Sequence, residues 1–313
     1  MSIRTLVSLS IIAVSAISPW ASAGDLPDNL EKKNLVAWCI VPLDAKKRGP
    51  AERAVMLKEL GIGRCAYDWR KENVEEFEEE ILEYKKHDIE YFAFWGSHEK
   101  AFELFKKYDV HPQIWQTAPG PKEGTQDQKV AAAADTIEAL AKRTKELGSK
   151  LGLYNHGGWG GEPENLVGVC KELHERGHEH VGIVYNWHHG HAEIKGWKES
   201  LKMMKPYLLC LNLNGMNDDA EPKILALGEG KHEKWMLNIV IESGYEGPIG
   251  ILDHQRELDS EKALKANLDG LTEMFDDDGE TLKPYFDDEG VKLLSDDEGL
   301  VGEWEAQKNY FFP

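Results

Sequence analysis

Polar side chains that can bind ligands or transfer protons gather in four short stretches of this sequence, at residues 154–159, 185–191, 212–217 and 253–255. These stretches hold five of the twelve histidines, together with asparagine, tyrosine and aspartate. Imidazole and carboxyl groups act as general acids and bases, and amides and phenols donate and accept hydrogen bonds. If folding brings the four stretches together, they predict a site that binds a hydroxyl-rich molecule and moves one of its protons.

The candidate residues follow from side-chain direction at strand ends. Side chains of a strand point to one side at every second position, so Tyr154 and His156 are predicted to share a face. Asp253 and His156 are the candidate acid/base residues. Aromatic rings can stack on the apolar face of a sugar while amides bind its hydroxyl groups. The candidate substrate-binding residues are His189, Asn186, Asn212, Asn214, Tyr154, Trp159, Trp187 and His254.

Each of these residue types also has a purely structural alternative. A tryptophan near a strand end can simply pack over the end of the sheet, and a histidine such as His156 can bind a backbone carbonyl inside the core. The site interpretation is favoured because the polar residues recur at four separate strand ends.

Strand-like and helix-like patterns alternate eight times along the chain, which indicates a parallel sheet. Eight units in roughly 250 residues predict a closed (β/α)8 TIM barrel, whose working residues lie at the C-terminal ends of the strands. An open, doubly wound sheet is the alternative, but no glycine-rich phosphate loop follows the first strand. The predicted strands are residues 35–42, 63–69, 89–95, 113–117, 151–156, 181–187, 208–214 and 248–254, and the predicted helices are residues 51–60, 74–86, 98–108, 128–147, 164–176, 194–204, 232–243 and 260–275.

The two ends of the chain have compositions unlike the barrel. Residues 1–23 hold one basic residue, an apolar run at 6–17 and the small residues Ala21 and Ala23, which is the pattern of a secretory signal peptide. The apolar run is too short to span a bilayer, although an uncleaved anchor is the alternative. We therefore expect a periplasmic or secreted protein with no membrane association after cleavage. The expected domains are the signal peptide (1–23), the barrel (24–275) and an acidic C-terminal tail (276–313).

The chain is strongly acidic, with 56 acidic and 37 basic residues and a formal net charge of −19. Such a charge repels polyanions at long range, so nucleic acid is not expected as a partner. It favours a neutral small-molecule carbohydrate as the partner instead. The acidic runs of the tail do not have the spaced pattern of a calcium-binding loop.

At the strand-end residues the chain resembles the xylose-isomerase-like TIM-barrel superfamily of sugar isomerases and epimerases, over residues 34–275. The most telling segments are 151–156, 181–186 with His189, and 244–254. The resemblance implies a divalent ion held by Glu, Asp, His and Glu on strands five to eight, with the two Glu residues moving the substrate's proton. It also implies that His189 contacts the substrate.

The positions that match these ligands are Tyr154, Asn186, Asn212 and Asp253, and each differs from the usual residue. Hard ions need charged oxygen ligands, so binding of Mn, Mg or Zn by Asp253, Asn186 and Asn212 is expected to be weak or absent. Three outcomes stay open. His156, His189 and His254 could rebuild a displaced metal site, the protein could be a metal-free enzyme using Asp253 and histidine, or the barrel could only bind a carbohydrate.

These observations support one main hypothesis about function and two alternatives. The main hypothesis is an enzyme that acts on a neutral sugar or sugar derivative by removing a proton next to a carbonyl group, as in isomerisation or epimerisation. The first alternative is a catalytically degenerate, carbohydrate-binding TIM barrel. The second is the DNA-repair endonuclease branch of the superfamily, which the acidic charge, the export signal and the substituted metal positions all disfavour.

Overall fold

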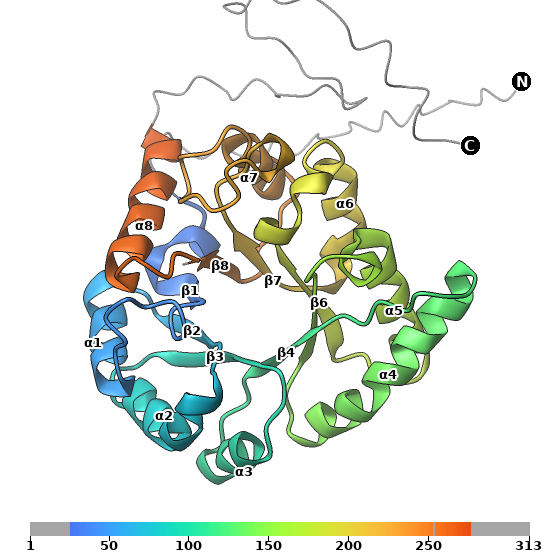
Figure 1. Ribbon diagram of the computed structural model, residues 1–313, viewed down its shortest axis with the longest axis horizontal. Helices are drawn as coiled ribbons and strands as arrows, with labels where there is room; N and C mark the ends of the chain where they lie inside the picture. Colours follow the sequence, from blue (N-terminus) through green and yellow to red (C-terminus); the bar gives the residue numbers. More distant parts are fainter. Residues whose placement is uncertain (1–25, 253, 277–313) are drawn as a thin grey trace, which may run out of the picture.

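The computed structural model describes residues 26–252 and 254–276. Eight parallel strands, each hydrogen-bonded to the next, close into a barrel because β8 also pairs with β1. The eight helices form a ring outside the strands (Figure 1). The strands are β1 Leu35–Trp38, β2 Arg64–Tyr67, β3 Glu90–Trp95, β4 Gln113–Thr117, β5 Leu151–Tyr154, β6 Val181–Asn186, β7 Leu208–Leu213 and β8 Ile249–Leu252, and the helices are α1 Pro50–Leu60, α2 Phe77–Lys86, α3 Glu99–Tyr108, α4 Gln126–Glu146, α5 Pro163–Glu175, α6 Trp197–Met204, α7 Glu233–Glu242 and α8 Ser260–Asp276.

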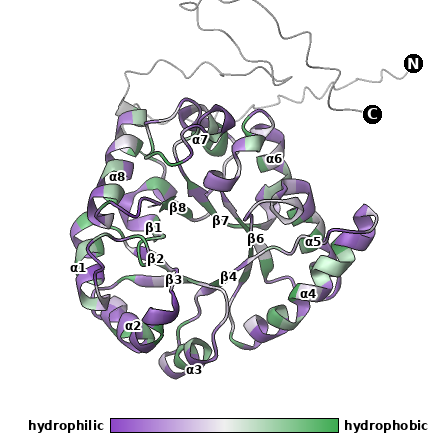
Figure 2. Cartoon of the chain, in the orientation of Figure 1, coloured by the Kyte–Doolittle hydropathy of each residue, from purple (hydrophilic) through white to green (hydrophobic). Residues whose placement is uncertain are grey.

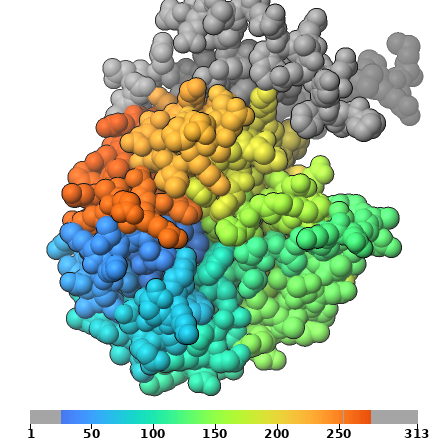
Figure 3. All heavy atoms as spheres, viewed as in Figure 1, coloured from blue at the N-terminus to red at the C-terminus, as the bar shows by residue number. Residues whose placement is uncertain are grey.

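The predicted (β/α)8 barrel is therefore confirmed, with one strand and one helix in each predicted unit. Successive units lie side by side around the molecule, and the first unit meets the last where β1 pairs with β8 (Figure 3). The predicted signal peptide and the acidic tail fall outside the described residues, apart from Asp276 at the end of α8.

Several strands end earlier than the sequence predicted. Strand β1 stops at Trp38, because Cys39 has a backbone φ of 64°, which turns the chain out of the sheet. Strands β5, β6 and β7 end at Tyr154, Asn186 and Leu213, so the residues predicted to follow them in each strand lie beyond its end. The alternation of side-chain direction therefore does not extend to His156, Trp187 or Asn214.

Local sequence signals explain where several helices begin and end. The backbone N–H of Thr125 donates to Oε1 of Gln128 at 2.9 Å, and the hydroxyl of Thr125 accepts from the N–H of Gln128 at 3.4 Å, which caps the start of α4. Helix α1 ends at Leu60 and is capped by Gly61. The φ of Gly61 is 76°, a conformation that residues with a side chain rarely adopt. The outer helices carry both hydrophobic and hydrophilic residues (Figure 2), as amphipathic helices do.

Two groups of buried side chains form the core. The larger group fills the layer between the strands and the helices. The smaller group lies inside the barrel and is rich in aromatic rings, among them Trp38, Trp115 and Tyr154. The interior is thus packed with side chains, as in other TIM barrels, and its aromatic rings lie beneath the C-terminal ends of the strands.

Glycine makes room for these large side chains inside the barrel. A methyl group at Gly152 would lie 2.5 Å from Cγ2 of Val184 and 3.0 Å from Cδ1 of Trp115. A methyl group at Gly250 would lie 1.9 Å from Oδ1 of Asn212. Both glycines therefore allow a bulky or polar side chain of a neighbouring residue to occupy the barrel interior.

Candidate functional site

Tyr154, the last residue of β5, is the centre of a buried hydrogen-bond network at the C-terminal end of the barrel. Its hydroxyl oxygen accepts from Nε1 of Trp38 at 3.1 Å and from Nδ2 of Asn186 at 2.5 Å. Burial raises the pKa of the Tyr154 phenol well above its usual range. The phenol therefore stays protonated at neutral pH, and its hydroxyl can still donate one hydrogen bond.

The ends of β5 and β6 are joined by two asparagines. Nδ2 of Asn155 donates to the backbone carbonyl of Asn186 at 3.0 Å, and the backbone N–H of Asn186 donates to Oδ1 of Asn155 at 2.7 Å. The side-chain oxygen of Asn186 accepts from the backbone N–H of His188 at 2.9 Å, which caps the short 3-10 helix Trp187–His189. These bonds orient the two histidines that follow β6.

Four histidine rings, those of His156, His188, His189 and His254, form a contiguous group that we name the histidine cluster. The ring centroids of His156 and His189 are 4.6 Å apart, those of His189 and His188 are 4.8 Å apart, and those of His188 and His254 are 4.1 Å apart. Residues that follow β5, β6 and β8 thus meet at one end of the barrel. The sequence predicted that these strand-end stretches converge, and His156, His189 and His254 were among its candidate site residues.

The imidazoles of three members of the cluster, His188, His189 and His254, are held in their neutral form. Burial, followed by repulsion from neighbouring histidines, lowers the pKa of His188 to about 2. The same two causes lower the pKa of His189 to about 3. Burial also lowers the pKa of His254. At neutral pH each of these rings can donate one hydrogen bond and accept another, which suits recognition of sugar hydroxyl groups.

Aromatic rings border the histidine cluster on the side of β1, β3 and β4. The ring centroid of Trp95 lies 4.9 Å from that of Tyr154 and 6.2 Å from that of His156. Trp38 packs against Trp95 at 5.6 Å and against Trp115 at 4.8 Å. Trp95 is partly exposed, while Trp38 and Trp115 are buried. Trp95 is therefore the ring of this group that a ligand at the barrel mouth can reach.

Three of the predicted binding residues are not part of this group. Trp187 is fully buried and its ring packs 5.6 Å from that of Trp197 in α6, in the layer outside the barrel. Trp159 donates from Nε1 to Gln126 at the start of α4. Asn214 donates to the backbone carbonyls of Gly215 and Lys223, so it braces the loop after β7. All three residues lie beyond the ends of their strands. The local loop conformation, and not the alternation of a strand, therefore sets the direction of their side chains.

The fourth strand-end position, Asn212 on β7, points into the barrel. Its side chain is fully buried and lies against Gly250 of the neighbouring strand β8. Its Oδ1 accepts from the thiol of Cys210 at 3.6 Å, and its Nδ2 has no partner among the described residues. An unpaired buried amide is costly, and Nδ2 is the hydrogen-bond donor of this side chain that stays unused among the described residues.

Asp253, the candidate acid/base residue that comes after β8 in the sequence, lies outside the described residues. His254 beside it is described and belongs to the histidine cluster, so β8 leads directly to the site.

The described residues at the expected ligand positions do not fit a divalent ion. The Tyr154 phenol remains protonated, the Asn186 amide is used by Tyr154 and by the backbone of His188, and Asn212 offers an amide rather than a charged oxygen. No group of three or more histidine, cysteine or acidic side chains suited to a metal occurs within 26–252 and 254–276. We therefore assign no chemical step to a metal ion.

Asp68, directly after β2, is a buried acidic residue that the sequence interpretation missed. Only 2% of its surface is exposed, and Oδ1 accepts one hydrogen bond, from the N–H of Val41 at 3.4 Å. Burial raises its pKa to about 7, a value typical of groups that transfer protons. Its position near the end of a predicted strand was a usable signal, but its burial depends on contacts with residues distant in sequence.

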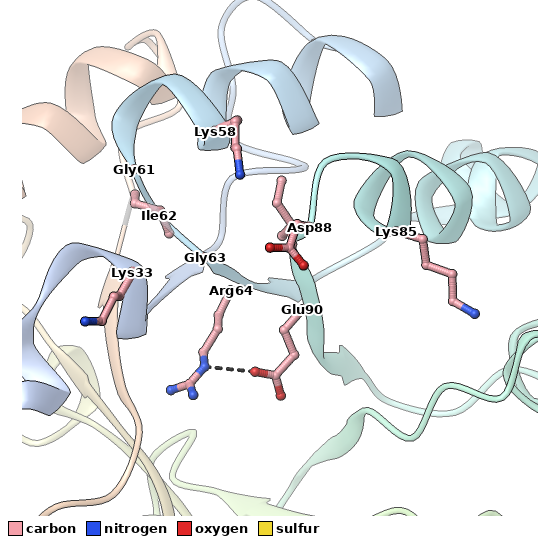
Figure 4. A pocket seen from close by; sticks show the side chains of 10 residues that line it. Lys33, Lys58, Gly61, Ile62, Gly63, Arg64, Lys85, Asp88 and Glu90 are labelled. Carbon is pink, nitrogen blue, oxygen red and sulfur yellow. Dashed lines mark hydrogen bonds and ion pairs between the residues drawn. The ribbon is translucent and has the colours of Figure 1, made fainter.

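A cavity of about 600 Å³ lies at the other end of the barrel (Figure 4). It is lined by residues at the start of β2 and β3, among them Arg64 and Glu90, whose Nε and Oε2 atoms are 2.8 Å apart. In TIM barrels this N-terminal end serves stability rather than chemistry. The histidine cluster at the C-terminal end is therefore the better candidate for a functional site.

Comparison with solved structures finds proteins with a similar fold. A 3-keto-D-glucoside 4-epimerase from E. coli has 14% sequence identity and a TM-score of 0.56, covering 77% of this chain and 97% of that one. The IOLI protein with a bound zinc atom has 12% identity and a TM-score of 0.61, with coverage of 77% and 97%. A D-psicose 3-epimerase with D-tagatose, from Clostridium cellulolyticum H10, has 11% identity and a TM-score of 0.54, with coverage of 77% and 96%.

The chain therefore shares its TIM-barrel fold with these epimerases and with a xylose isomerase-like TIM barrel protein from Mycobacterium smegmatis, in agreement with the resemblance of the strand-end segments. Comparison with protein-family models and with curated protein sequences finds no match. None of the helices within the described ranges has the length and apolar character needed to cross a membrane.

Proposed function

We propose that this protein is a sugar isomerase or epimerase that removes a proton from the carbon next to a carbonyl group of a sugar or sugar derivative. The observation that carries the proposal is the histidine cluster, which brings four imidazoles together at the C-terminal end of the barrel. Similarity to a 3-keto-D-glucoside epimerase and to a D-psicose epimerase supports the choice of substrate class.

The site residues divide into groups that bind and groups that transfer the proton. The imidazoles of His189 and His254, with the Asn212 amide, are proposed to bind hydroxyl groups of the sugar. Trp95 is proposed to stack on the sugar's apolar face, a role the sequence assigned to Trp159 and Trp187. Hydroxyl binding by Asn186, Asn214 and Tyr154 stays a prediction from the sequence. The side chains of Asn186 and Tyr154 hydrogen-bond to each other, and that of Asn214 donates to backbone carbonyls of its own loop.

Proton removal requires a base and a donor for the developing oxyanion. His156 is proposed as the base, because it is exposed and its ring lies next to the rings of Trp95 and His189. Asp253, which the sequence predicted as an acid/base residue, stays a proposed second acid/base residue. Neutral imidazole N–H groups are suitable donors to the oxygen that gains charge when the proton leaves.

Deuterium incorporation from heavy water tests this function. The protein is incubated in D₂O with a panel of aldoses, ketoses and 3-keto-glycosides, and proton NMR follows exchange at the carbon next to the carbonyl. We expect exchange and a new stereoisomer or regioisomer with at least one substrate. His156→Asn should slow exchange by about 100-fold or more, because a general base contributes a factor of that order.

His87→Asn is the matched control, since His87 follows α2 at the N-terminal end of the barrel and should leave exchange unchanged. Absence of exchange with every member of the panel would contradict an enzymatic function. In that case sugar binding that survives a metal chelator would support the alternative, a carbohydrate-binding barrel without catalysis. The bond between Tyr154 and Asn186 favours this alternative, because it uses two positions where catalytic metal ligands are expected.

A further inference from the structure

The hydroxyl of Tyr154 carries a proton that neither of its two hydrogen-bond partners accepts. The oxygen accepts from Nε1 of Trp38 at 3.1 Å and from Nδ2 of Asn186 at 2.5 Å. An indole nitrogen is a donor only. The orientation of the Asn186 amide is set by its Oδ1, which accepts from the backbone N–H of His188 at 2.9 Å. Both partners therefore donate, and the hydroxyl proton has no acceptor among the described residues.

A second donor without an acceptor lies on the neighbouring strand. Asn212 of β7 pairs in register with Asn186 of β6, and adjacent strands are about 4.8 Å apart. Nδ2 of Asn212 is buried and has no partner in the described part of the chain, while Oδ1 of the same amide accepts from the thiol of Cys210. Because Asn186 contacts the Tyr154 oxygen, the two unused donors lie at the same level of the barrel interior.

Their position distinguishes these two donors from other buried polar atoms without a partner. The hydroxyl of Tyr185, for example, belongs to a ring that packs 5.7 Å from that of Trp197 in α6, outside the barrel. Tyr154 belongs to the inner core, and its ring lies 4.9 Å from that of Trp95 and 6.1 Å from that of His156. Trp95 is partly exposed and His156 is exposed, so Tyr154 lies directly beneath side chains that a bound sugar can contact.

We propose that the hydroxyl of Tyr154 and the amide of Asn212 bind the carbonyl oxygen of the sugar and stabilise its negative charge while His156 removes the neighbouring proton. The C–H bond breaks, and its proton passes to the imidazole of His156. The electron pair left on carbon forms a carbon–carbon double bond, and the carbonyl pair moves to the oxygen, which becomes an oxyanion. This inference rests on the proposed function, and it makes the carbonyl oxygen, in place of a hydroxyl group, the acceptor for Asn212.

The hydrogen bonds around Tyr154 suit this role. Trp38 and Asn186 both donate to its oxygen, and hydrogen bonds in a chain polarise one another, so the remaining O–H becomes a stronger donor. The same bonds fix the position of the hydroxyl before a sugar binds. A donor fixed in advance stabilises a developing charge without the cost of reorganisation.

Proton exchange in D₂O with Tyr154→Phe tests the proposal. The probes are D-glucose, D-fructose and methyl 3-keto-D-glucoside, one from each class of sugar proposed as substrate. We expect the exchange rate at saturating sugar to fall by about 100-fold or more, which is the usual effect of removing one oxyanion donor. The dissociation constant, measured by calorimetry, should change little, because the lost bond strengthens mainly as the charge develops.

Tyr185→Phe is the matched control, since it removes the same hydroxyl from a buried tyrosine on β6 that faces α6, and it should leave exchange unchanged. Asn212→Leu, which removes the second donor with little change in volume, should also slow exchange without weakening binding. Circular dichroism and urea denaturation show which variants fold.

Infrared spectroscopy of methyl 3-keto-D-glucoside, labelled at its ketone carbon, provides a readout in the wild type that needs no variant. Two fixed donors should lower the frequency of the carbonyl stretch below its value in water. A band that stays at the value in water would overturn the inference.

Exchange in folded Tyr154→Phe and Asn212→Leu that equals exchange in Tyr185→Phe would also overturn the inference while leaving the proposed function standing. So would a loss of sugar affinity as large as the loss of rate, because it would indicate damage to the binding site. A loss in only one of the two variants would overturn the pairing of the donors. If none of the three sugars exchanges with the wild type, both the inference and the proposed function fail.

Discussion

Burial determines the chemistry of Asp68 at the end of β2. Its carboxyl group accepts a single hydrogen bond, from the backbone of Val41, and its Oδ2 atom has no partner in the described part of the chain. Burial disfavours the charged form and raises the pKa from 3.8 to about 7. The folded state therefore holds a proton that the unfolded state has released between about pH 4 and pH 7.

The substitution Asp68→Asn should stabilise the protein at high pH. Wild-type stability is expected to fall as the pH rises through this window, because the unfolded carboxyl ionises first. The amide keeps a side-chain oxygen for Val41 and has no charge to bury, so it avoids this loss. We expect the free energy of unfolding to exceed that of the wild type at pH 8, by on the order of 4 kcal/mol at most.

Urea denaturation of both proteins at about pH 4 and at pH 8 measures the effect, and the low-pH pair is the control. A difference between variant and wild type that does not grow with pH would show that Asp68 is not held protonated.

At the scale of elements, the loop after β1 is tied to the start of α8 by a buried ionic group. Nη1 of Arg48 lies 2.9 Å from Oδ1 of Asp44 and 2.7 Å from Oδ1 of Asp259, and its Nη2 lies 2.9 Å from Oε2 of Glu261. The backbone N–H of Ser260 also donates to Asp44, at 3.1 Å. These bonds hold the end of the segment that begins with His254, where β8 enters the site.

The substitution Arg48→Met should destabilise the fold and loosen the segment between β8 and α8. It leaves the buried Asp44 carboxylate without its partner, which typically costs about 3–5 kcal/mol. Urea denaturation gives the stability, and hydrogen exchange followed by mass spectrometry should show faster exchange at residues 254–260.

Arg143→Met is the comparison, because its ion pair with Glu99 is largely exposed and should contribute about 1 kcal/mol or less. Equal losses in the two variants, or unchanged exchange at residues 254–260, would argue against a special role for Arg48.

At the scale of the whole molecule, the chain is strongly acidic, with a formal net charge of −19. Such a charge repels polyanions at long range, so nucleic acid is not expected as a ligand.

Export itself is a proposal that mass determination can test. We expect the chain, expressed with residues 1–23 in a bacterium, to be recovered outside the cytoplasm with Gly24 as its first residue. Signal peptidases need small residues at the positions of Ala21 and Ala23, so Ala21→Arg should block processing. Intact mass spectrometry of both proteins shows whether residues 1–23 have been removed. A wild-type mass that still includes residues 1–23 would favour an uncleaved anchor instead.

The sequence by itself determined the architecture and the end of the barrel that carries the site. Hydrophobic periodicity is local, so eight alternating patterns were enough to predict eight strand–helix units and their closure. Because parallel strands end at one face, residues after β5, β6 and β8 had to converge, and His156, His189 and His254 do lie together.

Only the tertiary structure decided what the individual side chains do there. Trp187 and Asn214 turn away because the strands end before them, and a strand end depends on backbone bonds to a neighbour distant in sequence. The raised pKa of Asp68 and the bond between Tyr154 and Asn186 likewise depend on atoms from other strands. Desolvation and hydrogen-bond geometry act through space, so a linear pattern of residue types does not contain them.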